Sequence, residues 1–459
     1  MDRARIKLAA YWDGLPRWFR TAFTILAILY FAAWAYSAFL ATFNASNVSI
    51  PVLAKDATEY ATLSDSILTS HTFTLDGVIP ETFRSPGYPA FIAAIRSVCG
   101  GSFLAVTLIQ MLLMLANALL IQRLGRRFFS NRIGTIAATI FLLNPVTLII
   151  PLVIHTETLF VFLFLSLFLV LSGISKEKLW YGAISGGMLA AAAIYVRPMG
   201  FWAIPMFLAP ILLANISWKK RFVVAIAVIA VLGLLIVPWM ERNRRETGVF
   251  GFSSLSTEAI LSASIPMFKA HQNGTSIGTE MDKEIKDVGS TQVQWRQLSY
   301  EPSLTPYIAG FVRANFLPYA EYHLVTSLPF FFASDVEWSA YTYTLMTHQP
   351  FHYGEAAIFD LANGDFGSFF SKIIHPWWKF SERMLYCLMA ASALYAMWKL
   401  RRRMIVWICA GIIIYLALVN AEVATARHRF PADPFIYLLV SAGAVTLVES
   451  RTKKTAAEN

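Results

Sequence analysis

Long hydrophobic runs alternate with short polar or charged segments along most of the chain. A helix needs about 20 mostly apolar residues to span a bilayer, so each run of that length predicts a transmembrane helix. Prolines at Pro151 and Pro198 predict that some of these spans are tilted or broken. Ten spans are predicted, at roughly 22–43, 102–121, 133–151, 156–174, 180–196, 200–216, 221–240, 383–400, 404–421 and 432–448.

The positions of lysine and arginine predict how these helices are oriented. Short cytoplasmic loops carry an excess of basic residues. The N-terminus is basic, and a basic cluster also follows every even-numbered span. These residues are Arg3, Arg5, Lys7, Arg17 and Arg20, then Arg123, Arg126, Arg127 and Arg132, Lys176 and Lys178, Lys219, Lys220 and Arg221, Lys399 and Arg401 to Arg403, and Arg451, Lys453 and Lys454. Both termini are therefore expected in the cytoplasm, which requires an even number of spans, ten or alternatively twelve.

The same alternation assigns two long loops, 44–101 and 241–382, to the extracytoplasmic face. Two apolar runs in the second loop, 307–320 and 324–333, are too short to span a membrane. We expect helices that lie on the membrane surface there, with a re-entrant pair as the alternative. The predicted organisation is an N-terminal transmembrane module 1–240 that includes the outer loop 44–101, a large extracytoplasmic region 241–382, and C-terminal transmembrane helices 383–459.

The composition agrees with a polytopic, all-α membrane protein. Of the 459 residues 57% are hydrophobic and 14% charged, whereas a soluble domain carries about a quarter charged residues. The net charge of +10 does not indicate a nucleic-acid partner, because the basic residues are spread between apolar runs instead of lying on one soluble face. The three cysteines, Cys99, Cys387 and Cys409, have no metal-ligand spacing, so no metal site is predicted.

Unusual polar residues collect at the predicted extracytoplasmic ends of the helices. The first outer loop begins with Lys55-Asp56-Ala57-Thr58-Glu59-Tyr60 and ends with Phe83-Arg84-Ser85-Pro86-Gly87-Tyr88-Pro89. Three further segments are His155-Thr156-Glu157-Thr158, Tyr195-Val196-Arg197-Pro198 and Arg427-His428-Arg429-Phe430-Pro431. Carboxylates and arginines thus meet at one membrane interface.

Each of these residues also has a structural interpretation. Asp56 can be a helix cap or a solvated carboxylate, and arginines at helix ends often reach toward lipid headgroups. His155 fits an interfacial histidine better than a metal ligand. Glu157 is different, because a charge just inside an apolar run favours a paired or functional role. The remaining acidic residues of the first loop, Glu59, Asp65, Asp76 and Glu81, are expected to be solvated.

A carboxylate beside several arginines suits one kind of chemistry. A carboxylate accepts the proton of an acceptor hydroxyl, and partial burial raises its pKa toward neutrality and makes it a better base. Arginine stays charged and binds phosphate with two hydrogen bonds, so it stabilises a phosphate leaving group. Together these residues indicate transfer of a group from a phospholipid-like donor in the membrane.

These segments, in this order, resemble the polytopic glycosyltransferases of the GT-C fold. The similarity is to the bacterial branch related to protein mannosyltransferases and to the aminoarabinose transferase that acts on lipid A. The residues that carry it are Asp56 with Tyr60, the string from Arg84 to Pro89, Glu157-Thr158-Leu159-Phe160, Tyr195 to Pro198, and Arg427 to Pro431.

The resemblance implies an inverting enzyme of a bacterial plasma membrane, with its site on the extracytoplasmic face. It would move a sugar from a polyprenyl-phosphate carrier to an envelope glycan, lipid or protein. Asp56 would be the general base, and Glu157 would orient the acceptor or assist Asp56. The donor phosphate would be held by Arg84, Arg197, Arg427 and Arg429, with Tyr60, His155 and Tyr88 in support. Many relatives have Glu after the Asp where this chain has Ala57, so no cofactor is expected to be required, although a divalent cation stays open as an alternative.

Two other functions compete with this hypothesis. A transporter or flippase of a lipid-linked anionic glycan would need charged residues at mid-membrane depth and often has repeated halves. The predicted spans have few acidic residues outside their ends, and no repeat is visible. A non-catalytic scaffold of an envelope polysaccharide machine would not need Asp56.

Overall fold

The computed structural model describes residues 9–43, 55–347, 367, 377–422 and 425–458. Helices form its architecture, and within these ranges no β-strand occurs beyond an isolated bridge between Thr74 and Pro80. This confirms the predicted all-α class. The basic residues Arg3, Arg5 and Lys7 lie outside the described ranges.

Every predicted span coincides with helical structure. The helices in these regions are α2 (Arg17–Phe43), α5 (Phe103–Phe128), α6 (Asn131–Leu143) with α7 (Pro145–Ile149) and η1 (Ile150–Leu152), α8 (Glu157–Ser172), α9 (Leu179–Val196), η3 (Pro198–Phe201) with α10 (Ile204–Leu208) and η4 (Ala209–Leu213), α11 (Trp218–Thr247), α22 (Trp377–Lys399), α23 (Met404–Val419) and α25 (Asp433–Glu458). The first outer loop adds α3 (Lys55–Thr69) and α4 (Gly87–Val98).

Two of the predicted spans are broken, and proline accounts for both breaks. α6 and the α7–η1 segment differ in direction by 65°. The break is not at Pro151, where it was predicted, but at Asn144, whose side chain caps a new helix that has Pro145 in its first turn. The region 200–216 divides into η3, α10 and η4, each with a proline at its start. A proline lacks the amide hydrogen that would continue the preceding helix.

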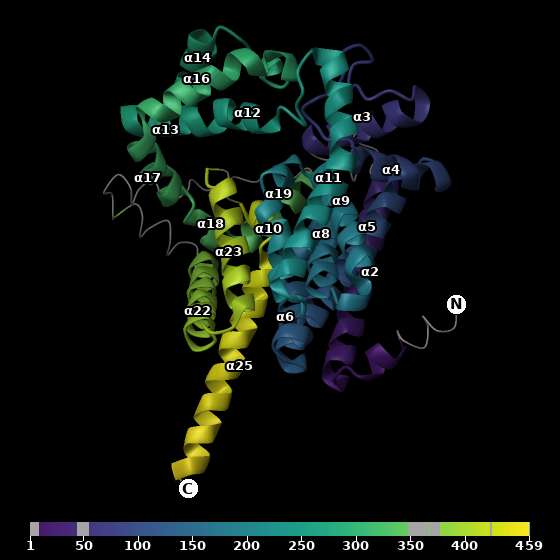
Figure 1. The fold of residues 1–459 in the computed structure, drawn as a ribbon, viewed down its shortest axis with the longest axis vertical. Coiled ribbons are helices and arrows are strands. Elements are labelled where there is room, and N and C mark those ends of the chain that lie inside the picture. Colours follow the sequence, from purple (N-terminus) through teal and green to yellow (C-terminus); the bar gives the residue numbers. More distant parts are fainter. Residues whose placement is uncertain (1–8, 44–54, 348–366, 368–376, 423–424, 459) are drawn as a thin grey trace.

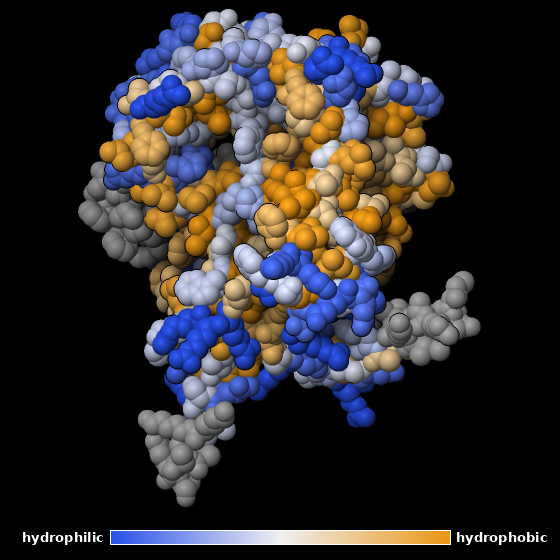
Figure 2. Space-filling model, viewed as in Figure 1, coloured by the Kyte–Doolittle hydropathy of each residue, from blue (hydrophilic) through white to orange (hydrophobic). Residues whose placement is uncertain are grey.

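The chain is a multi-pass membrane protein. Among the described helices, five are long and apolar enough to cross a membrane, or six if the bent α6–α7 pair is one span. The helix α8, the segment Ile204–Leu213 and the helix α23 are apolar but shorter. Figure 2 shows the consequence on one face, where an apolar belt lies between two hydrophilic ends.

The predicted outer loops lie at the same end of the bundle. In Figure 1, α3 and α4 are at the upper end, together with the helices α12 (Leu255–Ala259), α13 (Ile265–Asn273), α14 (Ile277–Val288) and α16 (Glu301–Ala314). α13, α14 and α16 enclose a small core of their own around Leu261, Ile265, Trp295 and Leu304. We call α12, α13, α14 and α16, with the segments between them, the helical layer. The helix α17 (Phe316–Thr326) connects this layer to the bundle.

The surface location predicted for the run 324–333 is only partly correct. α18 (Pro329–Phe332) and α19 (Asp335–Thr347) follow α17, and Phe330 and Trp338 are buried in the main hydrophobic cluster of the bundle. α18 contacts α22, and α19 contacts α7. Aromatic side chains from this segment therefore fill space between the long helices, which a helix on the membrane surface could not do.

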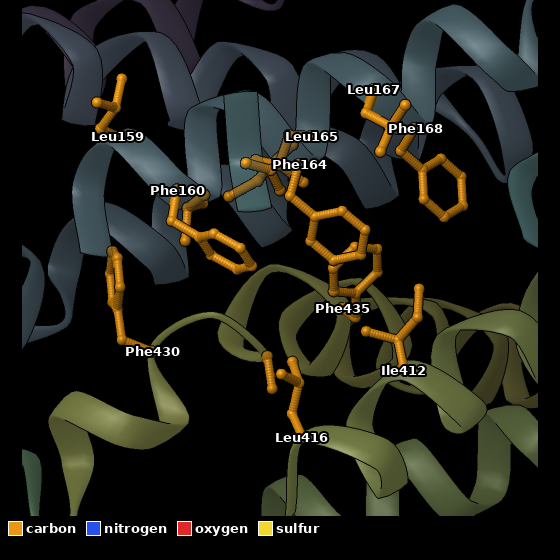
Figure 3. Close-up of a cluster of buried hydrophobic side chains, with 14 of the residues drawn as sticks. Leu159, Phe160, Phe164, Leu165, Leu167, Phe168, Ile412, Leu416, Phe430 and Phe435 are labelled. Atoms are coloured by element: carbon orange, nitrogen blue, oxygen red, sulfur yellow. The ribbon is translucent and has the colours of Figure 1, made fainter. Parts of the chain in front are cut away.

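The N-terminal and C-terminal helices share one core. Figure 3 shows Phe164 and Phe168 of α8 facing Phe435 of α25, with Ile412 and Leu416 of α23 beside them. The ring centroids of Phe164 and Phe435 are 5.3 Å apart. Because aromatic rings at this distance make extensive apolar contact, this seam stabilises the C-terminal helices against the N-terminal module.

Candidate active site

Segments that are far apart in the chain meet at the upper end of the bundle. Asp56 and Tyr60 lie one turn apart on α3, and Arg84 lies just before α4. Glu157 is the first residue of α8, and Arg197 is the residue after α9. Arg427 comes from α24 (Ala426–Arg429), which precedes α25. Apart from Tyr60, which was predicted in support, these are five of the six residues for which catalytic or phosphate-binding roles were predicted.

Local sequence explains two of these placements. The carboxylate of Glu81 accepts hydrogen bonds from the amides of Phe83 and Arg84 at 2.6 and 3.0 Å, which shapes the turn that presents Arg84. The residue before a proline disfavours helical geometry. Arg197, which precedes Pro198, accordingly leaves α9 with φ −137° and ψ 111° and turns its side chain into the site.

Asp56 is held between two guanidinium groups. Nη2 of Arg84 donates to Oδ1 at 2.5 Å, and Nη2 of Arg427 donates to Oδ2 at 3.1 Å. The Asp56 side chain remains 33% exposed, whereas that of Glu157 is fully buried. Asp56 is therefore the carboxylate that a substrate can reach.

Glu157 is neutralised by two arginines. Nε of Arg427 donates to Oε1 at 2.6 Å, and Nη1 of Arg197 lies 3.2 Å from the same oxygen. Nη1 of Arg197 is buried and makes no hydrogen bond to any described residue. Arg427 thus bridges the two predicted catalytic carboxylates, and Arg197 keeps a hydrogen-bond donor available for another acceptor.

Tyr60, His155 and Tyr88 surround this cluster. The Tyr60 hydroxyl accepts from Nη1 of Arg84 at 3.3 Å, and the Tyr60 ring packs edge-on against Tyr88 with centroids 5.0 Å apart. Tyr88 is buried and donates its hydroxyl to Gln110 at 2.5 Å, so it supports the site from behind. His155 is buried, and its Nδ1 has no hydrogen-bond partner among the described residues.

The arginines control protonation at this site. Burial raises the pKa of Asp56, but the guanidinium groups of Arg84 and Arg427 lower it by more than burial raises it. The pKa of Asp56 therefore lies well below the usual range. This differs from the elevated pKa that burial alone predicts. Burial, reinforced by the charge of Arg427, lowers the pKa of His155 to about 4, which keeps its imidazole neutral near pH 7.

Comparisons with known proteins give the chain's similarities. A family model described as dolichyl-phosphate-mannose-protein mannosyltransferase matches residues 83–240, a range that contains Arg84, Glu157 and Arg197. The oligosaccharyltransferase AglB from Archaeoglobus fulgidus, solved in complex with an inhibitory peptide and a dolichol-phosphate, superposes with a TM-score of 0.53 at 13% identity. The match covers 96% of this chain and 52% of AglB.

The chain has the GT-C fold. The fold predicted from its motifs is thereby confirmed. The chain spans about half the length of AglB, both in this complex and in the apo form, which also matches with a TM-score of 0.53. ArnT from Cupriavidus metallidurans, bound to undecaprenyl phosphate, matches with a TM-score of 0.41 at 11% identity over 92% of this chain and 77% of ArnT. A search of curated protein sequences finds no match.

Arg429 does not join Arg427 in this cluster. Its guanidinium donates to Asp335 at 2.5 Å, to Asp433 at 3.1 Å and to the carbonyl of Ala333 at 2.9 Å. Arg429 lies two residues after Arg427 on the short helix α24, and its side chain therefore points in another direction, toward α19 and α25. Because each of the three guanidinium nitrogens of Arg429 is engaged by these partners, we do not retain it among the residues that would bind a donor phosphate.

Glu59 and Arg296 belong to the cluster, although the sequence analysis did not find them. Glu59, which was expected to be solvated, is buried and accepts from Nε of Arg84 at 2.7 Å and from Nη2 of Arg296 at 2.8 Å. Glu81 was also expected to be solvated and is buried. The i, i+3 spacing of Asp56 and Glu59 was a usable signal, because it puts both carboxylates on one helix face. Nothing in the sequence marks Arg296.

A divalent metal does not fit between the carboxylates of this cluster. The guanidinium of Arg427 lies between Asp56 and Glu157 and occupies the position that a bridging cation would need. Throughout the described ranges, no group of three or more His, Cys, Asp or Glu side chains is arranged to hold a metal ion. The positive charge at this site comes from arginine.

Proposed function

We propose that the chain is a membrane glycosyltransferase that moves a sugar from a polyprenyl-phosphate carrier to an acceptor hydroxyl, with Asp56 as the general base. The observation that carries the proposal is the partly exposed Asp56 carboxylate, held between Arg84 and Arg427. The protein would lie in a bacterial plasma membrane with this site on the extracytoplasmic face. The acceptor would be an envelope glycan, a lipid or a protein.

The donor phosphate would bind to Arg197 and Arg427. Arg197 has a buried Nη1 without a hydrogen bond to any described residue, and Arg427 contacts both Asp56 and Glu157. Among the described residues, the ion pairs of Arg84, Arg197, Arg296 and Arg427 are with Asp56, Glu59 and Glu157, so four arginines meet three carboxylates and the cluster has a net positive charge. A phosphodiester with a single negative charge complements it.

The reaction is a single displacement. The acceptor oxygen attacks the anomeric carbon from the side opposite the phosphate, and the hydroxyl proton passes to Asp56. The bond between the anomeric carbon and the phosphate oxygen breaks, and its electron pair leaves with the polyprenyl phosphate. Arg197 and Arg427 stabilise the negative charge that develops there. One displacement inverts the configuration of the sugar.

Donor binding would also activate the base. In the structure, Arg427 donates to Asp56 and lowers its pKa. A phosphate that accepts hydrogen bonds from Arg427 draws this charge away from Asp56, and the pKa of the carboxyl then rises. The base would therefore become stronger only when the donor is bound.

An apolar cavity could hold part of the carrier's isoprenoid tail. It has a volume of about 330 Å³ and is lined by residues of α22, α23 and α25, among them Met389, Leu394, Ile413 and Ile436. Arg429, which shares the short helix α24 with Arg427, and Asp433 also line it. A flexible hydrocarbon chain suits such a lining, since burial of its apolar surface is favourable.

The test is to incubate the purified protein in detergent with a panel of polyprenyl monophosphate sugars and to measure release of polyprenyl phosphate. We expect release from at least one donor, with or without a chelator, because arginine supplies the charge. Failure of every donor to bind or react would overturn the proposal. In liposomes, carrier movement across the bilayer without cleavage would indicate the alternative, a transporter or flippase of a lipid-linked anionic glycan.

A further inference from the structure

Glu59 is the centre of an ion-pair arrangement that the reaction above does not use. Its Oε2 accepts from two arginines at once, Nε of Arg84 at 2.7 Å and Nη2 of Arg296 at 2.8 Å. The Glu59 side chain is 10% exposed, against 33% for Asp56 on the same helix face. Glu59 is thus less accessible to a substrate than Asp56 and is already saturated by cations.

Arg84 differs from the other arginines of the cluster because each of its guanidinium nitrogens is engaged. Nε donates to Glu59, Nη1 to the Tyr60 hydroxyl and Nη2 to Asp56. Arg197, by contrast, has a buried nitrogen without a hydrogen bond to any described residue. A phosphate could bind Arg84 only by displacing one of these partners, so Arg84 is better suited to orient Asp56 than to bind the donor.

Arg296 comes from the helical layer at the upper end of the bundle. It lies between α15 (Gln292–Trp295) and η6 (Leu298–Tyr300), and its Cζ is 4.0 Å from the centre of the Phe83 ring. The segment is tied down on both sides of Arg296. The Ser254 hydroxyl donates to the Arg296 carbonyl at 2.6 Å, and the Leu298 amide donates to the Thr82 hydroxyl at 3.1 Å. Arg296 is therefore fixed beside the turn that carries Arg84.

We propose that Glu59 and Arg296 are positioning residues, which hold Arg84 on Asp56 and so orient the general base without contacting the donor. Glu59 fixes the Nε edge of Arg84, and its planar guanidinium then presents Nη2 to Asp56. Arg296 supplies the second charge that keeps Glu59 ionised and in place. The proposal rests on the proposed function, because it assigns Asp56 the role of base.

The test compares four charge-removing variants: Glu59→Gln, Arg296→Gln, the double variant of both, and Arg197→Gln. Arg244→Gln is a matched control, because Arg244 also pairs with a glutamate, Glu241, but is exposed. If Glu59→Gln does not fold, Glu59→Asp takes its place in the comparison, because it keeps the charge but has a side chain one methylene shorter. Two quantities are measured in detergent: the affinity for undecaprenyl phosphate, and kcat with the donor that the panel identifies.

We expect Glu59→Gln and Arg296→Gln each to lower kcat about tenfold or more, since small displacements of a catalytic group cost this much. Their affinity for undecaprenyl phosphate should stay within about twofold of wild type, whereas Arg197→Gln should weaken it about tenfold. The double variant should be no slower than the slower single variant, because the two residues act as a unit. Arg244→Gln should match wild type in both measurements.

Two results would overturn the inference while the proposed function stands. One is a loss of carrier affinity in Glu59→Gln or Arg296→Gln as large as that in Arg197→Gln, which would make them donor-binding residues. The other is wild-type kcat in both single variants. If wild type itself binds no undecaprenyl phosphate, the proposed function fails first, and this inference fails with it.

Discussion

Asp56 shows how the neighbours of a single residue can reverse the effect of burial. A partly buried carboxyl group normally has a raised pKa. Here Arg84 and Arg427 donate directly to its two oxygens and lower the pKa below the usual range. The free site therefore has an ionised but weak base, and the strength of that base depends on where the arginines donate.

Asp56→Asn removes the proton acceptor and leaves the size of the side chain almost unchanged. We expect kcat to fall by about 10² to 10⁴, the usual contribution of a general base. Affinity for undecaprenyl phosphate should be retained or increased, because Arg84 and Arg427 lose a competing anion. Turnover measurements and carrier titrations check this. Unchanged turnover would remove Asp56 as the base.

Arg427 and Arg429 are two positions apart but should respond differently to replacement by lysine. Arg427→Lys keeps a charge near Glu157 but loses the bridge to Asp56, so we expect about tenfold weaker binding of undecaprenyl phosphate or more. Arg429→Lys breaks the contacts that join Asp335, Asp433 and Ala333, and we expect lower thermal stability with unchanged carrier affinity. Equal loss of affinity in both variants would contradict this assignment.

At the scale of the elements, the site depends on how closely α4 approaches α9. Gly87 is the first residue of α4, and a Cβ added there would lie 2.6 Å from the backbone carbonyl carbon of Tyr195. Arg84 lies three residues before Gly87, and Arg197 lies two residues after Tyr195. The close approach of the two helix ends therefore sets the separation of two arginines of the site.

Gly87→Ala should disturb both arginines at once. The backbone of Tyr195 cannot move aside cheaply, so we expect about 1–3 kcal/mol of destabilisation together with reduced turnover. Thermal unfolding in detergent and the donor assay measure the two effects. Gly233→Ala in α11 is the control, because a Cβ there meets nothing within 4 Å. A wild-type melting curve for Gly87→Ala would show that the contact relaxes.

At the scale of the whole molecule, the helical layer is joined to the bundle near the segment that leads to α24. Nδ1 of His323 on α17 lies 2.6 Å from Oε1 of Glu422, and its Nε2 lies 2.8 Å from the carbonyl of Leu418. The Ser264 hydroxyl donates to the same Glu422 oxygen at 2.8 Å. α17, the segment of Ser264 and the end of α23 thus meet at one carboxylate.

This junction should weaken as the pH rises. The hydrogen bond to Glu422 raises the pKa of His323, although burial opposes it. Because the folded state has the higher pKa, the stabilisation is fully present below the unfolded value of about 6.5 and is lost as the pH rises through the folded pKa. His323→Gln should therefore lower the melting temperature more at pH 6 than at pH 9. The lost contribution to the free energy of unfolding should be about 1 kcal/mol or less. An equal effect at both pH values would count against an ionised His323.

Much of the architecture follows from local properties of the sequence. The length of each apolar run is set by the thickness of a bilayer, and the breaks at Pro145 and near Pro198 follow from the missing amide hydrogen. The alternation of basic clusters predicted that Asp56, Glu157, Arg84, Arg197 and Arg427 share one end of the bundle, and the structure brings these five together. Their chemical roles remain predictions.

Tertiary structure decided which charges form pairs. Arg296 and Glu59 are 237 positions apart, and no local pattern relates them. Arg429 was grouped with Arg427 because they are neighbours in sequence, but the short helix α24 turns them to different partners. Ion pairing falls off over a few ångströms, so it depends on the packing of the whole bundle. A sequence predicts which face of the membrane a charge lies on, and only the packed fold decides what that charge meets.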